Sequence, residues 1–373
     1  MLKAFKYRLY PNATQTIFLK KTMGCVRYYW NQQVSVFNSY DKESAYTPKF
    51  KTSTETWNEH EWMKDVSAAA IQQKENDFIE FRRQYFSKSR KTKIKRPRFK
   101  KRGQGESFRL PFPRFTLKGD RIKIEKIGLI KFSKDRTIPD DTKLMSVTVS
   151  MDQCGSFFAS VLVKTNSLHV QKTGKTIGID VGLSEFAVTS DGEVVPNPRY
   201  FRKSQAKLRK GQKHFSRKKK GSSRRKKAKL KVATLYRKIA NQRKFFLHNV
   251  SIGIVKRYDE IFIEDLNISG MVKNRKLAKS ISDASFFKFF SLLRYKCDWY
   301  GKTLTKTYRF APTSKTCSSC GKVKEQLELS ERTYHCEACG LIMNRDENAA
   351  KNIQAMGVDI AKRAQRECKT LAC

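Results

Sequence analysis

Four cysteines in two Cys-x-x-Cys pairs constrain the fold of this chain more than any other feature. Cys317 and Cys320 form the first pair, Cys336 and Cys339 the second, with fifteen residues between the pairs. This spacing is typical of a structural zinc site, in which two tight turns bring four thiolates together. A glycine follows each pair and permits the positive φ that such a turn needs. Four unrelated buried thiols are the alternative, which the matched spacing disfavours.

The net charge predicts a polyanionic partner. The 373 residues carry 79 Lys and Arg against 34 Asp and Glu, a formal net charge of +45. Such a charge opposes compaction by self-repulsion unless a polyanion neutralises it. Nucleic acid is favoured over a membrane surface, because no stretch has the apolar length of a spanning helix.

The remaining features of the composition predict a reducing compartment such as the cytoplasm. The N-terminus has no apolar signal-peptide core, and the cysteines outside the two pairs show no disulfide pattern. We expect these five to fill core positions or to lie in an exposed tail: Cys25, Cys154, Cys297, Cys368 and Cys373.

The N-terminal half reads as a strand, helices and then short strands. Residues 2–10 alternate apolar and basic side chains, which is the period of a strand. Thr14 is the expected N-cap of a helix that continues to Phe37, and a second helix covers residues 66–86. After a basic loop, short β-rich runs indicate a small antiparallel barrel that includes the first strand, with the helices inserted into it. The loop spans residues 88–102 and the β-rich runs lie between residues 107 and 163.

The second half alternates strands and helices. A buried strand opens at Thr176 and leads into a hairpin with Asp191-Gly192 as its turn. A long basic helical region follows at residues 197–256. We expect later elements at residues 260–266 (strand), 284–300 (helix) and 303–309 (strand), then a helix that starts near Asn344 and ends in a short polar tail.

The basic helical region is the main candidate for nucleic-acid contact. It has 17 Lys and Arg between Arg199 and Lys231, and no acidic residue occurs over the 65 positions from 194 to 258. This imbalance favours a phosphate-binding surface over a solvated helix face. Few aromatic residues interleave with the charges, so we expect contact with the backbone rather than the bases. The named candidates are Lys218, Lys219, Arg224 and Arg225.

Three acidic residues are candidates for a catalytic metal site. Asp180 interrupts an apolar strand, Glu264 ends the next apolar strand, and Asp346 begins the last helix. Ligands gather at strand ends in α/β sheets, and a buried carboxylate needs a partner or a metal. The alternative is that Glu264 and Asp346 merely cap their elements. In a chain this basic, a divalent site with oxygen ligands indicates phosphodiester hydrolysis with two Mg²⁺ ions.

Four motifs, in this order, resemble the TnpB (OrfB) family of insertion-sequence proteins, relatives of the type V CRISPR effectors. They are Gly-Ile-Asp-Val-Gly at 178–182, Ile-Glu-Asp-Leu-Asn at 263–267, the cysteine pairs introduced by Pro312, and Arg-Asp-Glu-Asn-Ala-Ala-Lys-Asn at 345–352. The opening residues 6–11 are also similar, so the resemblance covers the whole chain. One departure is Asn344, where the family commonly has Asp.

The resemblance implies an α/β multidomain chain in which a RuvC-like (RNase H fold) nuclease domain carries a zinc ribbon and follows a small β-barrel with a helical recognition insertion. It implies RNA-guided cleavage of double-stranded DNA beside a short transposon-adjacent motif, by a monomer bound to a guide RNA from the element. It also implies a cytoplasmic, nucleoid-associated protein of a prokaryotic cell. Asp180, Glu264 and Asp346 would hold Mg²⁺, and the four paired cysteines would hold zinc. The implied domains are 1–10 with 103–170 (barrel), 11–102 (insertion), 171–310 with 341–373 (nuclease) and 311–340 (zinc ribbon).

Two alternative functions stay open at this point. A family member that only binds would act as an RNA-guided repressor and would be expected to lose one of the acids, yet all three are present. An accessory transposase acting in DNA recombination is the other alternative, although no recombinase nucleophile stands out. For the adjacent DNA motif, the candidate readers are Gln72, Gln73 and Lys74, unless they only form a solvated helix face.

Overall fold

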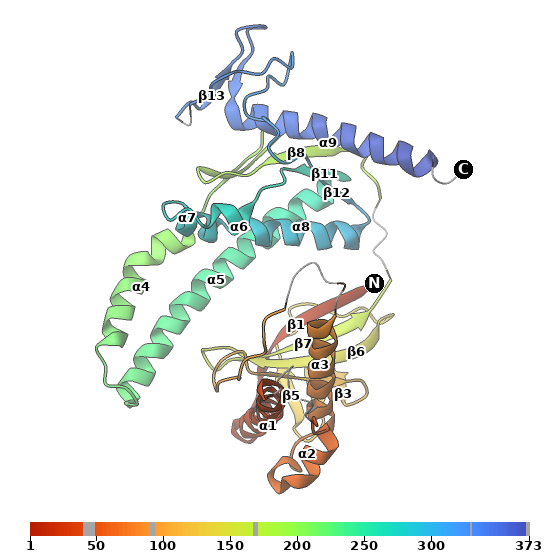
Figure 1. Cartoon of the computed structure of the whole chain (residues 1–373), viewed down its shortest axis with the longest axis vertical. Coiled ribbons are helices and arrows are strands. Elements are labelled where there is room, and N and C mark those ends of the chain that lie inside the picture. Colours follow the sequence, from red (N-terminus) through yellow and green to blue (C-terminus); the bar gives the residue numbers. More distant parts are fainter. Residues whose placement is uncertain (40–48, 88, 90–93, 167–170, 329, 371–373) are drawn as a thin grey trace. The chain divides into compact units, whose positions relative to one another are not determined.

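The computed structural model describes residues 1–39, 49–87, 89, 94–166, 171–328 and 330–370, and the chain divides into two compact units (Figure 1). The first unit spans Met1–Asn166 and the second Ser167–Cys373. Each contains both helices and strands, so the chain is of the mixed α/β class. Across the described part of the chain, no helix is long and apolar enough to cross a membrane.

The first unit is built on a seven-stranded antiparallel sheet with the order β2-β6-β7-β1-β5-β4-β3. The N-terminal strand lies inside the sheet, because β1 pairs with β7 on one side and β5 on the other. Alternation explains this position: Phe5, Tyr7 and Leu9 are buried, whereas Lys6 and Arg8 between them are exposed. The strands are β1 (Leu2–Tyr10), β2 (Ser107–Pro111), β3 (Phe115–Lys118), β4 (Arg121–Ile124), β5 (Gly128–Phe132), β6 (Lys143–Met151) and β7 (Phe157–Lys164).

Helices of the first unit lie between β1 and β2 in the sequence. The expectation that Thr14 caps the first helix is wrong. Asn12 is the cap, because its side chain accepts a hydrogen bond from the Gln15 N–H while the Gln15 side chain accepts one from the Asn12 N–H. The helices are α1 (Ala13–Asn38), α2 (Ser53–Glu59), a 3-10 turn η1 (Glu61–Met63) and α3 (Ala68–Phe86).

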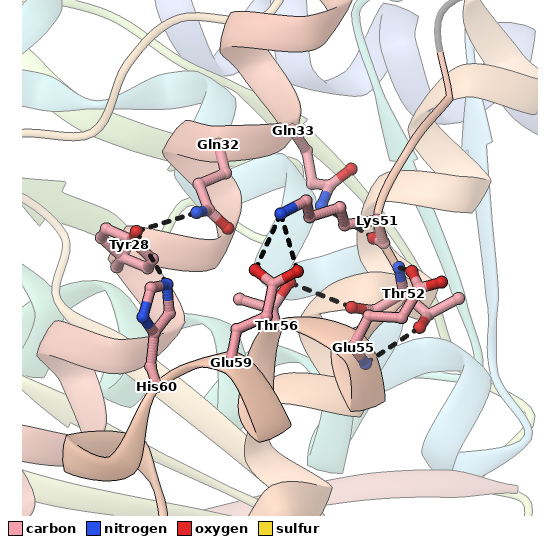
Figure 2. A network of polar contacts seen from close by, with 9 residues as sticks. All are labelled: Tyr28, Gln32, Gln33, Lys51, Thr52, Glu55, Thr56, Glu59 and His60. Carbon is pink, nitrogen blue, oxygen red and sulfur yellow. Dashed lines mark hydrogen bonds and ion pairs between the residues drawn. The ribbon is translucent and has the colours of Figure 1, made fainter.

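Polar contacts fasten α2 to α1 (Figure 2). The Tyr28 hydroxyl lies 3.0 Å from the His60 ring nitrogen, and Gln33 donates to the Lys51 carbonyl at 2.9 Å. Lys51 in turn forms an ion pair with Glu59 at 2.7 Å. These contacts hold a short helix that could not form in isolation.

The second unit contains a five-stranded mixed sheet with the order β10-β9-β8-β11-β12. Strands β8, β11 and β12 are mutually parallel, and β9 and β10 are antiparallel to their neighbours. The predicted turn at Asp191-Gly192 joins β9 to β10, and Gly192 has φ +82°. The strands are β8 (Thr176–Asp180), β9 (Glu185–Thr189), β10 (Val194–Pro196), β11 (Glu260–Ile263) and β12 (Thr303–Lys306).

Three helical boundaries in the second unit differ from the sequence expectation. The long basic region is two helices, separated at residues 217–222, where Gly221 has φ +85° and Ser222 caps the second helix. The helix expected at 284–300 is interrupted by Ser285 at φ +60°. The last helix continues to Thr370 instead of ending in a short polar tail. The helices are α4 (Tyr200–Ser216), α5 (Ser223–Arg257), α6 (Ile268–Met271), α7 (Ala278–Ala284), α8 (Phe286–Tyr300) and α9 (Arg345–Thr370).

Helices cover both faces of the mixed sheet (Figure 1). Ile177, Ile179 and Ile261 face the core that α5 and α8 share with the sheet. On the opposite face α9 lies so close that a Cβ on Gly178 would be 2.1 Å from the Ala350 carbonyl oxygen. Glycine is therefore required at position 178, and this close packing fixes α9 against the strand that ends in Asp180.

Candidate functional site

The sheet brings Asp180 and Glu264 together. Strands β8 and β11 are parallel and pair in register, with Ile179 opposite Ile263. Asp180 ends β8 and Glu264 directly follows β11, so both lie at the same edge of the sheet. Neighbouring strands are about 4.8 Å apart. Two carboxylates that are distant in the sequence thus become neighbours.

The third acid, Asp346, lies in the first turn of α9. Asn344 accepts hydrogen bonds from the N–H groups of Asp346 and Glu347 and so serves as the N-terminal cap. Asn caps a helix as well as Asp does, which explains why the departure from the family pattern at this position leaves the helix start intact. The positive end of the helix dipole also stabilises the Asp346 carboxylate.

The electrostatics of Asp180 show that the three acids form one cluster. Burial, followed by repulsion from Glu264 and then from Asp346, raises the pKa of Asp180 to about 7. Arg345 opposes this rise, and its guanidinium lies 3.2 Å from an Asp346 carboxylate oxygen. Three carboxylates with one adjacent cation form a site with excess negative charge, which a divalent cation would relieve.

Two residues that the sequence analysis missed connect this cluster to the cysteine segment. The Thr313 hydroxyl donates a hydrogen bond to the Glu264 carboxylate. Asn352, on α9, donates to the carbonyls of Thr313 at 2.8 Å and Thr316 at 2.6 Å. Asn352 and the buried Asn348, described below, are four positions apart on α9. This spacing places both on one helix face, and it could have identified them as a pair.

The four paired cysteines converge as the spacing predicted. Among the residues that the structure describes, they alone form a group of three or more potential ligands with all ligand atoms within 4.8 Å of one another. The Cys317–Cys339 and Cys320–Cys336 sulfurs are both 3.6 Å apart. This separation is far too long for a disulfide and close to the roughly 3.8 Å between thiolates in a tetrahedral zinc site.

The two cysteine turns have the same geometry, which fits a bound zinc ion. Gly321 and Gly340 have φ of +77° and +71°, and each donates its N–H to the carbonyl of the first cysteine in its pair. Backbone N–H groups, first that of Cys339, lower the pKa of the Cys336 thiol to about 6 although desolvation opposes this. A short hairpin of β13 (Thr333–His335) and β14 (Ile342–Asn344) supports the second turn and leads directly into α9.

Buried Asn348 fixes the first cysteine turn to α9. Its side chain accepts a hydrogen bond from the Ser318 N–H at 2.9 Å and donates one to the Thr316 carbonyl at 2.7 Å. The cysteine segment is therefore held by the same helix that carries Asp346.

The remaining cysteines have no comparable arrangement in the described part of the chain. Cys25 and Cys297 are buried, and burial raises the pKa of their thiols to about 11 and about 12. They fill core positions, as expected, and Cys154 is half-buried. The expectation for the Cys368 side chain and for Cys373 concerns positions outside the described residues.

Arg225 has a different role from the other basic candidates, because its guanidinium is engaged within the protein. Its guanidinium donates to the carbonyls of Phe215, Ser216 and Lys218, and it stacks over the Phe215 ring at 4.4 Å. Arg225 therefore closes the turn between α4 and α5. Lys219 and Arg224 are exposed at this turn, and Lys218 is half-buried.

The candidates on α3 do not form one exposed surface. Gln72 is exposed, but Gln73 and Lys74 are half-buried. Lys74 forms an ion pair with Asp77 and lies over the Trp30 ring at 5.7 Å. In the basic loop at 88–102, residues 88 and 90–93 lie outside the described part of the chain.

Three family models match the chain, and they define its class. A "Probable transposase" model of the OrfB group matches residues 159–275, and a "Cas12f1-like, TNB domain" model matches residues 286–353. These ranges contain Asp180, Glu264, the four paired cysteines and Asp346. A "Helix-turn-helix domain" model matches residues 1–40, yet the described residues of that range form strand β1 and the single helix α1. The class is that of OrfB proteins of transposable elements.

Full-length relatives then give the family. The chain is 35% identical over 364 residues to a Streptomyces pristinaespiralis protein named "Putative RNA-guided DNA endonuclease", covering 95% of this chain and 89% of the relative. It is 31% identical over 383 residues to Escherichia coli "Putative RNA-guided DNA endonuclease InsQ", covering 95% and 92%. The chain belongs to this family, the OrfB or TnpB family.

A solved structure shows the same fold at lower identity. The protein in "Cryo-EM structure of the Cas12f1-sgRNA-target DNA complex" matches with a TM-score of 0.53 and 15% identity, covering 95% of this chain and 98% of that chain. The fold is thus shared with a protein that was solved with a guide RNA and target DNA.

Proposed function

We propose that this chain is an RNA-guided DNA endonuclease of an insertion sequence, which hydrolyses a phosphodiester bond of double-stranded target DNA beside a short adjacent motif. The observation that carries the proposal is the cluster of Asp180, Glu264 and Asp346 at one sheet edge, in a chain of this family. The excess of 79 basic over 34 acidic residues supports nucleic-acid partners. The guide RNA would select the target by base pairing, as in related effectors.

The carboxylate cluster fits divalent metal ions better than it fits proton transfer alone. Asp180, Glu264 and Asp346 supply oxygen ligands, which Mg²⁺ prefers. Two Mg²⁺ ions held by these carboxylates would supply the chemistry that activates a water and stabilises the leaving oxygen.

The chain's own residues hold this cluster in place. Thr313 fixes one oxygen of Glu264 by its hydroxyl hydrogen bond. Close packing at Gly178 fixes the distance between α9 and the end of β8, and hence between Asp346 and Asp180. Arg345 lies beside the cluster and partly neutralises it in the absence of substrate. The site is thus built from rigid elements rather than from loops alone.

The two units would carry separate tasks under this proposal. We assign the mixed sheet of the second unit, with its antiparallel β9 beside three parallel strands, to a RuvC-like domain of the RNase H fold. The four cysteines form the zinc ribbon inserted before α9. In the first unit, β1 together with β2–β7 would form the small antiparallel barrel, and α1–α3 the recognition insertion. We expect the chain to act as a monomer bound to its guide RNA.

The test of the proposed activity uses the purified chain with the RNA that co-purifies from cells expressing its element. Asp180→Ala, Glu264→Gln and Asp346→Ala should each abolish cleavage of a matching target in Mg²⁺, while RNA and target binding stay within a few-fold. Near wild-type cleavage by any of the three would remove that residue from the site. Target binding without cleavage by the unmodified chain would support an RNA-guided repressor, and strand joining would support a transposase.

Zinc is tested separately by elemental analysis. We expect one zinc ion per chain, which Cys320→Ser should release with a loss of local folding, because binding and folding of such sites are coupled. Fully active protein without zinc would contradict the assignment.

A further inference from the structure

Phe310 combines two features that folding alone does not explain. Its side chain is 92% exposed, the highest value among the large apolar side chains that the structure describes. Its φ is +67°, in the left-handed region that bulky side chains rarely adopt. The left-handed conformation strains the backbone, and exposure means that the ring gains nothing from burial. Such outliers concentrate at functional sites.

The loop that contains Phe310 is held on both sides by contacts with residues 264 and 265. The preceding residue, Arg309, forms an ion pair with Asp265 at 2.9 Å, and Asp265 is adjacent to Glu264. On the other side, Thr313 donates its hydrogen bond to Glu264 itself. The exposed ring is therefore held within three residues of two anchors on residues 264–265.

The surroundings favour a nucleic-acid strand as the occupant. Lys306 also pairs with Asp265, at 2.7 Å, so two cations share one carboxylate and a positive charge remains for a phosphate. Asp265, Lys306 and Arg309 line a cavity of about 530 Å³. On α8, exposed Phe287 and Arg294 also line it. Aromatic rings beside surplus cations are the groups by which proteins hold unpaired nucleotides.

We propose that Phe310 stacks on an unpaired base of the DNA strand presented to the carboxylates, and so positions the phosphodiester bond for cleavage. This inference rests on the proposed function. The strained loop already holds the ring in this exposed position in the free protein. The side chain therefore does not have to become ordered when the strand binds. Phe310 is a positioning residue, because it contacts the substrate base and not the reacting phosphate.

Cleavage and folding should respond to Phe310 variants in opposite directions. Phe310→Gly relieves the left-handed strain but removes the ring, and we expect single-turnover cleavage to fall on the order of 10- to 100-fold, the effect of losing one stacked base. Its melting temperature should equal or exceed that of the unmodified protein. Phe310→Trp should retain cleavage. Phe112→Ala is the control, since Phe112 is 49% exposed in the turn between β2 and β3 of the first unit, and it should cleave normally.

A second measurement reports on stacking directly. In an Asp180→Ala background, a target strand carries the fluorescent base 2-aminopurine, moved through successive positions. We expect quenching at one position that Phe310→Gly abolishes and Phe310→Trp retains. Unchanged cleavage by Phe310→Gly, while Asp180→Ala is inactive, would overturn the inference and leave the proposed function standing. A fall in melting temperature with unchanged quenching would assign Phe310 to a contact within the protein and also overturn it.

Discussion

The Thr313 hydroxyl donates a hydrogen bond to the Glu264 carboxylate, although the residues are 49 positions apart. Asn352 holds the Thr313 carbonyl at 2.8 Å, and Asn352 lies on the same helix as Asp346. One threonine therefore joins the end of β11, the start of the cysteine segment and α9. The cysteine segment and the carboxylate cluster are therefore held together by the same hydrogen bonds.

Replacing Thr313 should weaken metal binding without removing a ligand. Thr313→Val leaves Glu264 without its orienting partner, and the loss of such a partner typically costs 10- to 100-fold in metal affinity or activity. We expect the Mg²⁺ concentration for half-maximal cleavage to rise by about this factor. Thr313→Ser keeps the hydroxyl and should behave like the unmodified protein. An unchanged Mg²⁺ dependence of the valine variant would show that the hydrogen bond has no role in the site.

The close packing of α9 gives a second prediction. A Cβ on Gly178 would be 2.1 Å from a backbone oxygen of α9, so Gly178→Ala should displace the helix and destabilise the second unit by roughly 1–3 kcal/mol. Cleavage should fall because Asp346 moves away from Asp180. In the matched control Gly253→Ala, nothing lies within 4 Å of the added Cβ, and helix propensity favours Ala by about 1 kcal/mol. Urea unfolding of both variants measures the difference, and equal stabilities would contradict it.

The turn between α4 and α5 should contribute to RNA binding through charge alone. Changing Lys218, Lys219 and Arg224 to Gln should flatten the slope of log K against log salt by about 0.7–0.9 for each phosphate that these side chains no longer neutralise. Sequence preference should stay the same, because phosphate contacts carry no sequence information. Arg225→Gln should instead lower thermal stability, since this guanidinium holds carbonyls of the turn. An unchanged slope for the triple variant would assign these charges to solubility.

Buried Lys296 predicts a pH dependence of stability. Burial lowers the pKa of this amine from 10.5 to about 8, and its partners are the His248 carbonyl and the Ser251 hydroxyl. Between pH 8 and 10.5 the unfolded chain binds a proton that the folded chain has released, so stability rises with pH in this window. Below pH 8 the buried charge costs stability in full.

The measurement compares the unmodified protein with Lys296→Met, which fills the same space without a charge. From about pH 8 to about pH 10 the unmodified protein should gain roughly 2 kcal/mol relative to the variant. If the stability of both proteins changed with pH in the same way, the buried ammonium group would not destabilise the folded state.

Local chemistry explains which features could be predicted from sequence. The convergence of the four cysteines follows from their spacing, because each Cys-x-x-Cys pair with its glycine is a self-contained turn. The Asp191-Gly192 hairpin is equally local, since positive φ at Gly192 closes it. The cap of α1 was predicted wrongly, at Thr14 instead of Asn12, because either side chain can accept the same kind of hydrogen bond.

Contacts distant in sequence were decided by the tertiary structure. Asp180 and Glu264 were identifiable as unusual acids, but only the parallel register of β8 and β11 makes them neighbours. Arg225 was indistinguishable in the sequence from Arg224, and only the fold shows that its donors are committed to backbone carbonyls. Thr313 and Phe310 carried no sequence signal at all. Patterns of spacing and charge in the sequence thus determined which chemical groups this protein has. Long-range packing determined which side chains meet, because those meetings depend on contacts between segments that no local pattern encodes.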